Sequence, residues 1–229
     1  MPEVTVVIPT RNEEASIGAV IEEVHKALGN RLLEILVVDT ESQDQTRAIA
    51  AAKGARILPE PRRGYGRAYK TGFAAARGTY IVTLDADLTY PADRIPDFLS
   101  ALESSRADFV SGDRISNLRG DAMTGMHRLG NFVLSGAFRT LFRTEIRDSQ
   151  SGMWAFRRDI LPRLSLIHEG MAFSEELKIE AIRGGFRFLE IPIDYRVRVG
   201  DKKIRSMRDA TKNLIWLARK RFGWVPPTR

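Results

Sequence analysis

The chain alternates between short apolar runs and longer segments in which apolar residues recur at helical spacing. The apolar runs have the length and composition of buried strands, and they cover residues 4–9, 34–39, 80–85 and 108–112. The first intervening segment predicts a helix over residues 14–28. Its buried face would consist of Ile17, Val20, Ile21, Val24 and Leu28. Strands alternating with helices predict an α/β fold whose mainly parallel sheet has crossover helices.

Four further elements follow from local signals. They are a helix from about residue 44 to residue 53, a strand over 55–58, a helix between Gly66 and Gly78, and a helix from Pro91 through Leu102. Ser42 or Asp44 can cap the first of these helices, because short polar side chains accept hydrogen bonds from exposed helix amides. Pro91 suits a helix start, since a proline in the first turn loses no hydrogen bond.

Polar clusters directly follow three of the predicted strands. They are Pro9 to Glu13, Asp39 to Ser42, and Asp85-Ala86-Asp87. Ligands of open α/β sheets lie at the carboxyl ends of the strands, so these clusters predict the site. Two carboxylates two residues apart can hold Mg²⁺ or Mn²⁺, and the cation can hold a diphosphate. The first turn lacks G-x-G-x-x-G, which argues against a dinucleotide-binding dehydrogenase.

The length of 229 residues suits one large α/β domain with a C-terminal extension. The chain contains no cysteine, which excludes disulfides, thiolate metal sites and cysteine nucleophiles and is compatible with a cytosolic compartment. The formal charge of +7 favours phosphate-bearing partners, whether nucleotides, nucleic acid or an anionic membrane surface. No window approaches the roughly 18 to 20 apolar residues of a membrane span, so a soluble or peripheral protein is expected.

Several motifs occur together in a fixed order. Beside the three strand-end clusters, they are the stretches from Pro61 to Gly72 and from Asp148 to Phe156. In this combination the chain resembles the family 2 inverting glycosyltransferases, and the two stretches resemble its dolichyl-phosphate sugar synthase branch. The resemblance extends to about Arg205 and implies a GT-A nucleotide-sugar-binding fold. We therefore expect a catalytic domain over residues 1–205 and a basic amphipathic helix with a tail over 206–229.

The resemblance also implies roles for individual residues. The nucleotide sugar would be bound by Pro9, Arg11, Glu13, Asp39, Asp85, Ala86, Asp87, Thr89, Arg198 and Lys203. Arg114 and Arg128 would bind an acceptor phosphate, and Arg198 would close over the diphosphate. In the family, the motif after the second strand commonly has another Asp at the position where this chain has Thr40. This departure affects the expected contact to the nucleotide base more than it affects the reaction class.

The chemistry can also be argued without the family. A departing diphosphate needs its growing negative charge offset by a metal ion and basic side chains. Asp87 is the expected direct metal ligand, and Asp85 either ligates the metal or binds the ribose. A phosphate acceptor is already anionic and needs no general base. By resemblance to the family, Glu176 falls where hydroxyl-glycosylating relatives keep a catalytic base. With a phosphate acceptor, we expect Glu176 instead to act by positioning or by pairing with an arginine.

Two segments combine apolar residues with arginines at helical spacing, residues 128–142 and 210–224. Such helices can lie in a membrane interface, where Trp and Arg are favoured, or they can pack on the core. Both alternatives stay open on the sequence alone. The last residues, 226–229, are expected to form a frayed tail.

Taken together, the sequence predicts a metal-dependent hexosyltransferase. It would move mannose or glucose from a GDP- or UDP-sugar to a polyprenyl or dolichyl phosphate, with inversion, at the cytosolic membrane face. The enzyme would be peripheral or held by a membrane-anchoring partner. A soluble transferase with a sugar or small phosphorylated acceptor is the nearest alternative, and a phosphatase is a distant one. A basic nucleic-acid-binding module is disfavoured, because paired carboxylates would hinder binding to a phosphate backbone.

Overall fold

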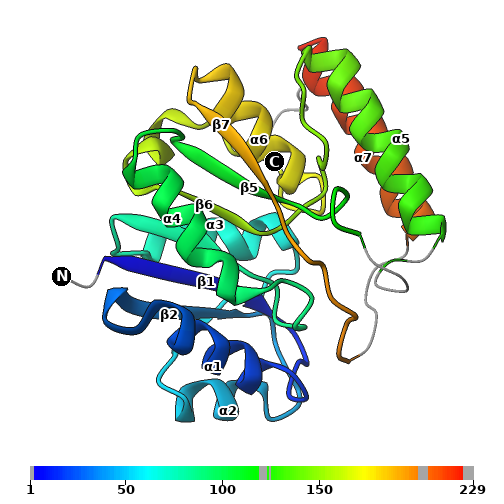
Figure 1. The fold of residues 1–229 in the computed structure, drawn as a ribbon. Coiled ribbons are helices and arrows are strands. Elements are labelled where there is room, and N and C mark those ends of the chain that lie inside the picture. Colours follow the sequence, from blue (N-terminus) through cyan, green and yellow to red (C-terminus); the bar gives the residue numbers. More distant parts are fainter. Residues whose placement is uncertain (1–2, 119–122, 124, 201–205, 224–229) are drawn as a thin grey trace.

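The computed structural model describes residues 3–118, 123, 125–200 and 206–223. Figure 1 shows a central sheet with helices on both faces and a pair of long helices, α5 and α7, beside it. The strands are β1 (Val4–Thr10), β2 (Leu32–Asp39), β3 (Arg56–Pro59), β4 (Tyr80–Thr83), β5 (Phe109–Asp113), β6 (Trp154–Arg157) and β7 (Phe188–Pro192). The α-helices are α1 (Ile17–Leu28), α2 (Thr46–Ala52), α3 (Tyr65–Ala75), α4 (Ile95–Glu103), α5 (Gly125–Phe142), α6 (Phe173–Arg183) and α7 (Ser206–Arg221).

The sheet has the strand order β3-β2-β1-β4-β6-β5-β7. Neighbouring strands are parallel except β6, which runs antiparallel to both β4 and β5. The predicted α/β class and mainly parallel sheet are confirmed. Because β6 is reversed, the residues that precede it lie at the carboxyl ends of β4 and β5. This places the segment from Asp148 to Met153 beside Asp85.

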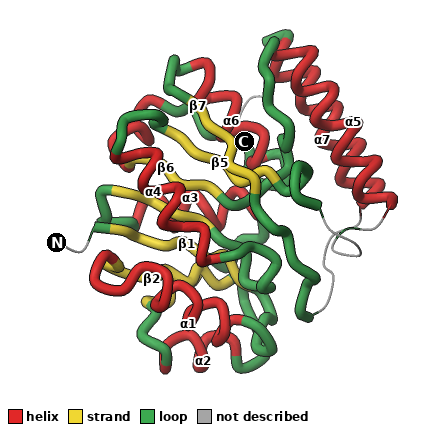
Figure 2. Tube along the Cα trace, in the orientation of Figure 1, coloured by secondary structure: helices red, strands yellow, loops and turns green. Residues whose placement is uncertain are grey.

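Successive side chains of the central strands point to opposite faces of the sheet and pack into two separate apolar clusters. Val6 and Ile8 of β1 belong to one apolar cluster with α1 and α4, whereas Val7 belongs to a second cluster with α3 and α6. This follows from the period of two in a strand that is covered on both faces. The five residues predicted for the buried face of α1 are all buried. The helices on both faces of the sheet are visible in Figure 2.

Several predicted boundaries differ from the observed ones. Helix α1 begins at Ile17 rather than near Glu14, because Asn12 has a φ of 51° and the chain turns before the helix starts. Pro91 precedes a short 3-10 helix, Ala92–Arg94, and α4 begins only at Ile95. Strand β4 ends at Thr83, so Asp85 and Asp87 lie in the following loop.

Gly72 brings α3 into close contact with the sheet. A Cβ at this position would overlap the Val7 side chain and lie 3.1 Å from Cγ2 of Val38. We expect Gly72→Ala to destabilise the protein by about 1–3 kcal/mol, because an extra methyl forces packed strands and helix apart. Gly136→Ala in α5 is the matched control, since its nearest neighbour would be an arginine Nη2 at 4.0 Å.

The control should be neutral or gain up to about 1 kcal/mol from better helix propensity. Chemical denaturation of both variants measures the difference. Equal free energies of unfolding for the two variants would contradict the tight approach of α3 to β1 and β2.

Helices α5 and α7 pack against each other and against α6. Their common buried cluster contains Leu134, Phe138, Ile146, Ile179 and Leu217. The opposite faces are exposed and apolar, with Met126, Leu129, Phe132 and Val133 on α5 and Leu214 and Ile215 on α7. Each predicted amphipathic segment therefore both packs on the protein and presents apolar side chains. Residues 224–229, with Trp224 and the predicted tail, lie outside the described residues.

None of the described helices combines the length and the hydropathy that crossing a bilayer requires.

Candidate nucleotide and metal site

The loops after β1 and β2 hold each other in place at the carboxyl edge of the sheet. The Asn12 amide donates to the Ser42 hydroxyl at 2.8 Å, and the Gln43 amide donates to Oδ1 of Asn12 at 2.8 Å. The Glu13 amide donates to Oγ1 of Thr46 at 2.7 Å. Two loops far apart in sequence thus form one rigid rim. Pro9 and Arg11 are half-buried in this rim.

Asp39 lies at the end of β2 with only 2% of its surface exposed. One carboxylate oxygen accepts the Ser42 amide at 3.1 Å, and the other accepts the Thr10 hydroxyl at 3.2 Å and the Ser42 hydroxyl. Arg47 lies 3.6 Å from this carboxylate. The side chain shapes the turn through Thr40, and its contact to a ribose or base stays a prediction.

Asp87 is held from two sides. Its Oδ1 accepts hydrogen bonds from the Thr89 amide at 3.1 Å and the Thr89 hydroxyl at 2.6 Å. Its Oδ2 accepts a hydrogen bond from Nη1 of Arg198 at 2.6 Å, while Nη2 of Arg198 lies 2.8 Å from Oε1 of Glu13. The structure therefore brings together Glu13, Asp87, Thr89 and Arg198, which the resemblance had grouped from distant parts of the sequence.

Asp85 faces a group of aromatic hydroxyls. The Tyr65 and Tyr69 hydroxyls each lie 3.4 Å from its Oδ1. Burial, together with the neighbouring charge of Asp87, raises the pKa of Asp85 to about 7. Ala86, between the two acids, is buried. A cation bound beside Asp85 would favour its charged form.

A glycine is required beside this group. The Gly152 amide donates to the Tyr90 hydroxyl at 2.7 Å, and a Cβ at Gly152 would collide with the Tyr65 hydroxyl and lie 3.6 Å from Asp85. Only glycine lets the chain before β6 approach Asp85 so closely.

The segment after β7 crosses the Asp87 loop as a strap, residues 193–200. The Arg196 amide donates a hydrogen bond to the Thr89 carbonyl at 2.9 Å, and the Val199 amide donates one to the Asp87 carbonyl at 3.1 Å. The Arg196 side chain pairs with Glu23 at 2.8 Å and Asp93 at 3.2 Å. These contacts position Arg198 over Asp87. Lys203, predicted for the same loop, lies outside the described residues.

Arg114 follows β5 and forms a buried bidentate ion pair. Its Nε and Nη2 donate to the Asp148 carboxylate at 2.7 and 2.8 Å. Its guanidinium also lies 5.2 Å from the centre of the Tyr195 ring, and its charge partly offsets the rise in the pKa of Asp85. Arg114 thus joins the Asp85 and Asp87 group. Arg128 is exposed in the first turn of α5.

The two glutamates at the start of α6 have different surroundings. Glu176 accepts hydrogen bonds from the Ile167 and His168 amides at 3.0 and 2.7 Å and pairs with Lys220 of α7 at 3.3 Å. Glu175 instead accepts a hydrogen bond from Nε2 of Gln150 at 2.5 Å. Through Gln150, Glu175 rather than Glu176 contacts the segment from Asp148 to Met153, which lies beside Asp85. The pairing of Glu176 is with a lysine and not with an arginine.

Glu175 should make stability fall as the pH rises. Burial raises its pKa to about 8 from an ordinary value of 4.5, so the folded state binds more protons than the unfolded state between these values. Stability is therefore lost progressively from about pH 4.5 to pH 8. We expect Glu175→Gln to remove this component, so its melting temperature relative to wild type should rise with pH.

Thermal melts of both proteins at pH 5 and pH 8 measure the effect. Burial lowers the pKa of Lys178, which lies beside this group, from 10.5 to about 8, so its effect on stability falls mainly between pH 8 and pH 10.5. A constant difference between Glu175→Gln and wild type at the two pH values would show that Glu175 is ionised throughout.

Sequence reasoning did not single out several side chains around Asp85 and around the segment that precedes β6. They are Tyr65, Tyr69, Tyr90, Asp148, Glu175 and Lys178. A partial signal existed, because Tyr65 and Tyr69 lie four residues apart and therefore share a helix face. Nothing in the local sequence indicated that Asp148 would pair with Arg114, since that contact depends on the reversed strand β6.

The chemistry of the donor set fits a hard divalent cation. Asp85 and Asp87 would hold it, and no group of three His, Cys, Asp or Glu side chains suited to a metal occurs in the described part of the chain. Mg²⁺ commonly binds through one or two carboxylates together with substrate phosphates and water. Two carboxylates beside arginines suit a cation that is shared with a diphosphate.

Comparisons with known proteins agree with this geometry. A family model described as glycosyl transferase family 2 matches residues 5–165. A dolichyl-phosphate hexose transferase of Haloferax volcanii is 34% identical over 202 residues, which cover 88% of this chain and 86% of that protein. The low-salt glycan biosynthesis hexosyltransferase Agl6 of the same organism is 34% identical over 98% of this chain, which spans only 55% of Agl6.

The fold has close counterparts among solved structures. Glucosyl-3-phosphoglycerate synthase from Mycobacterium tuberculosis, crystallised with Mn²⁺, UDP and glucosyl-3-phosphoglycerate, superposes with a TM-score of 0.78 at 23% identity. The match covers 99% of this chain and 82% of the synthase. The expected GT-A fold is confirmed. With strand-end acids in the predicted place and a family model over most of its length, the chain belongs to glycosyltransferase family 2.

Proposed function

We propose that this glycosyltransferase moves a hexose from a GDP- or UDP-sugar to a polyprenyl phosphate, with inversion and with Mg²⁺ or Mn²⁺. The observation that carries the proposal is the Asp85 and Asp87 pair beneath Arg198, with Arg114 beside it. Similarity to the dolichyl-phosphate hexose transferase over 88% of this chain supports the acceptor class. Family membership favours transfer over the phosphatase and the nucleic-acid-binding module.

On the donor side, Asp87 would ligate the metal directly and Asp85 would ligate it or bind the ribose. When bound, the cation offsets the charge that grows on the leaving diphosphate. Arg198 would leave its pairing with Asp87 and Glu13 and contact the diphosphate instead. Pro9, Arg11, Asp39, Ala86 and Thr89 would line the nucleotide, and Lys203 would add a further positive charge.

On the acceptor side, Arg114 and Arg128 would bind the acceptor phosphate. The ion pair with Asp148 fixes the Arg114 guanidinium, so this charge is oriented before the acceptor arrives. Since a phosphate oxygen is anionic near neutral pH, no side chain has to remove a proton from it. Glu176 would act by positioning, through its contacts to the backbone at residues 167 and 168 and to Lys220.

The C-terminal part would face the membrane. We assign residues 1–205 to catalysis and residues 206–229 to an amphipathic extension that lies at the membrane interface, on the cytosolic side. The exposed apolar side chains of α5 and α7 support this assignment, because they adjoin the exposed basic residues Arg128, Lys212 and Arg219. A membrane-anchoring partner could cover the same face.

A screen of radiolabelled nucleotide sugars tests the proposal. GDP-mannose, GDP-glucose and UDP-glucose are each offered with Mg²⁺ or Mn²⁺ and with a polyprenyl phosphate or 3-phosphoglycerate. Transfer into the organic phase with the polyprenyl phosphate is the expected result. Transfer only to 3-phosphoglycerate would instead favour a small phosphorylated acceptor, as the structurally similar glucosyl-3-phosphoglycerate synthase suggests. Metal-independent transfer would contradict the role of Asp87.

A further inference from the structure

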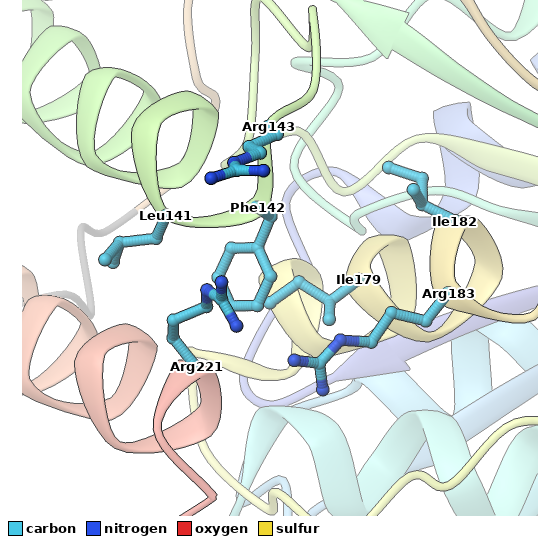
Figure 3. Close-up of a pocket in the computed structure, with 7 residues that line it drawn as sticks. All are labelled: Leu141, Phe142, Arg143, Ile179, Ile182, Arg183 and Arg221. Carbon is cyan, nitrogen blue, oxygen red and sulfur yellow. The ribbon is translucent and has the colours of Figure 1, made fainter.

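A hollow lies away from the strand-end acids, between the ends of three helices. It has a volume of about 210 Å³ and is formed by the C-terminal turns of α5, α6 and α7 (Figure 3). Its lining consists of Leu141, Phe142, Arg143, Ile179, Ile182, Arg183 and Arg221. None of these residues belongs to the nucleotide and metal site.

The topology separates this hollow from the catalytic edge. Helix α6 leads into β7, and β7 runs parallel to β5. The C-terminal end of α6 therefore lies near the amino ends of these strands, whereas Asp85 and Asp87 follow the carboxyl end of β4. A ligand in the hollow would leave the donor site free.

Three arginines converge on the hollow from three different elements. Arg183 lies over the Phe142 ring, 5.3 Å from its centre, which holds its guanidinium at the rim. Among the described residues, Arg143, Arg183 and Arg221 form no ion pair. Glu180, three residues before Arg183 in α6, is already paired with Lys220 at 2.9 Å. The positive charge of the hollow is therefore not neutralised by the described carboxylates.

Helix polarity explains part of this arrangement. Arg183 and Arg221 are the last residues of α6 and α7, and Arg143 directly follows α5. Positive side chains are favoured at helix C-termini, where the macrodipole carries about half a negative charge. Three full positive charges exceed three such partial charges, so the convergence leaves a net positive potential that favours an anion.

The apolar floor of the hollow indicates which class of anion would bind there. Ile179 is 1% exposed, and Leu141, Phe142 and Ile182 add apolar surface beneath the arginines. Phe222, the residue after Arg221, is 77% exposed. A hydrated inorganic anion gains nothing from such a floor, whereas an amphiphile gains from both the charges and the apolar contact.

We infer that the hollow binds the phosphate headgroup of an anionic phospholipid. The three arginines contact the phosphate, the apolar floor contacts the glycerol and the first methylenes, and Phe222 enters the acyl boundary. This site is distinct from the acceptor site of the proposed function and does not depend on it. It gives the far ends of α5 and α7 a specific lipid contact.

Vesicle sedimentation of the full chain tests the inference. The probe is phosphatidylcholine vesicles with and without 20% phosphatidic acid, a lipid whose headgroup is a phosphate. We expect Arg183→Gln with Arg221→Gln to weaken binding to the anionic vesicles about tenfold or more, because each basic residue near such a surface is worth about a factor of five. The matched control removes two exposed arginines elsewhere, Arg106→Gln with Arg158→Gln, and should change binding less than twofold.

Two further measurements keep the result interpretable. Thermal melts establish that both double variants are folded, and retention of UDP or GDP in both establishes that the donor site is intact. Equal weakening in the two double variants would overturn the inference, since diffuse surface charge would then explain binding. Unchanged vesicle binding in Arg183→Gln with Arg221→Gln would also overturn it. So would stabilisation by 10 mM orthophosphate without any preference for the anionic vesicles.

Discussion

Asp87→Asn is expected to abolish metal-dependent retention of UDP or GDP and to lower hexosyl transfer by about 10²- to 10³-fold. Asparagine keeps the shape of the side chain and can still accept hydrogen bonds from Thr89, but it removes the negative charge that a cation requires. The loss should therefore concern the metal rather than the fold. Titration calorimetry with each nucleotide, in Mn²⁺ and in chelator, measures the retention.

The matched control for this change is Asp159→Asn. Asp159 is an exposed carboxylate in the short 3-10 helix that follows β6, and it pairs with Arg157 at 3.5 Å. Nucleotide retention should be unchanged in this variant. If Asp87→Asn retained nucleotide in Mn²⁺ as wild type does, the assignment of the metal to Asp87 would be wrong.

Asp148→Asn is expected to destabilise the protein by about 3 kcal/mol, because it leaves the Arg114 guanidinium buried without its counter-charge. Asp148 is fully buried and Arg114 is 7% exposed, so water cannot replace the lost partner. Chemical denaturation at pH 7 measures the free energy of unfolding. Transfer activity should fall as well, since Arg114 would no longer be fixed beside Asp85.

An exposed pair provides the control. Arg94, directly before α4, and Asp97, in the first turn of α4, form an exposed pair with a separation of 3.1 Å, and such pairs contribute about 0–1 kcal/mol. Asp97→Asn should therefore change stability little. Similar losses in Asp148→Asn and Asp97→Asn would mean that the buried pair is no more important than the surface one.

The pH dependence of the same pair has a definite sign. Burial favours the neutral acid at Asp148, but the charge and hydrogen bonds of Arg114 outweigh it and lower the pKa. The folded state then binds fewer protons than the unfolded state, so this contribution is present above the unfolded pKa of Asp and lost as the pH falls below it. Asp148→Asn should consequently be less sensitive to acid than wild type below about pH 4.

The strand-end clusters were predictable because each depends on a short stretch of sequence. An apolar run that ends in Asp85-Ala86-Asp87 defines both a buried strand and the loop after it, so the acids could be placed at the sheet edge without a structure. The same holds for Asp39 after β2 and for Glu13 after β1. Parallel strands bring such loops to one edge whatever the details of packing.

The start of α6 shows where this reasoning stops. Glu175 and Glu176 are adjacent and chemically identical, and the resemblance pointed to Glu176. Which of the two contacts the segment beside Asp85 depends on the rotation of the helix about its axis, and α3, β6 and α7 together determine that rotation. A change of one residue turns a helical side chain by about 100°, so only packing distinguishes the two.

By itself, the sequence determined the α/β class, the buried face of α1 and the acids at the strand ends, because these depend on period and on neighbours in the chain. Only the tertiary structure decided the reversal of β6, the pairing of Arg114 with Asp148 and the position of Arg198 over Asp87. It also decided the convergence of three arginines beside Phe142. Each of these joins residues distant in sequence, and their contacts depend on how whole elements pack, which no local pattern specifies.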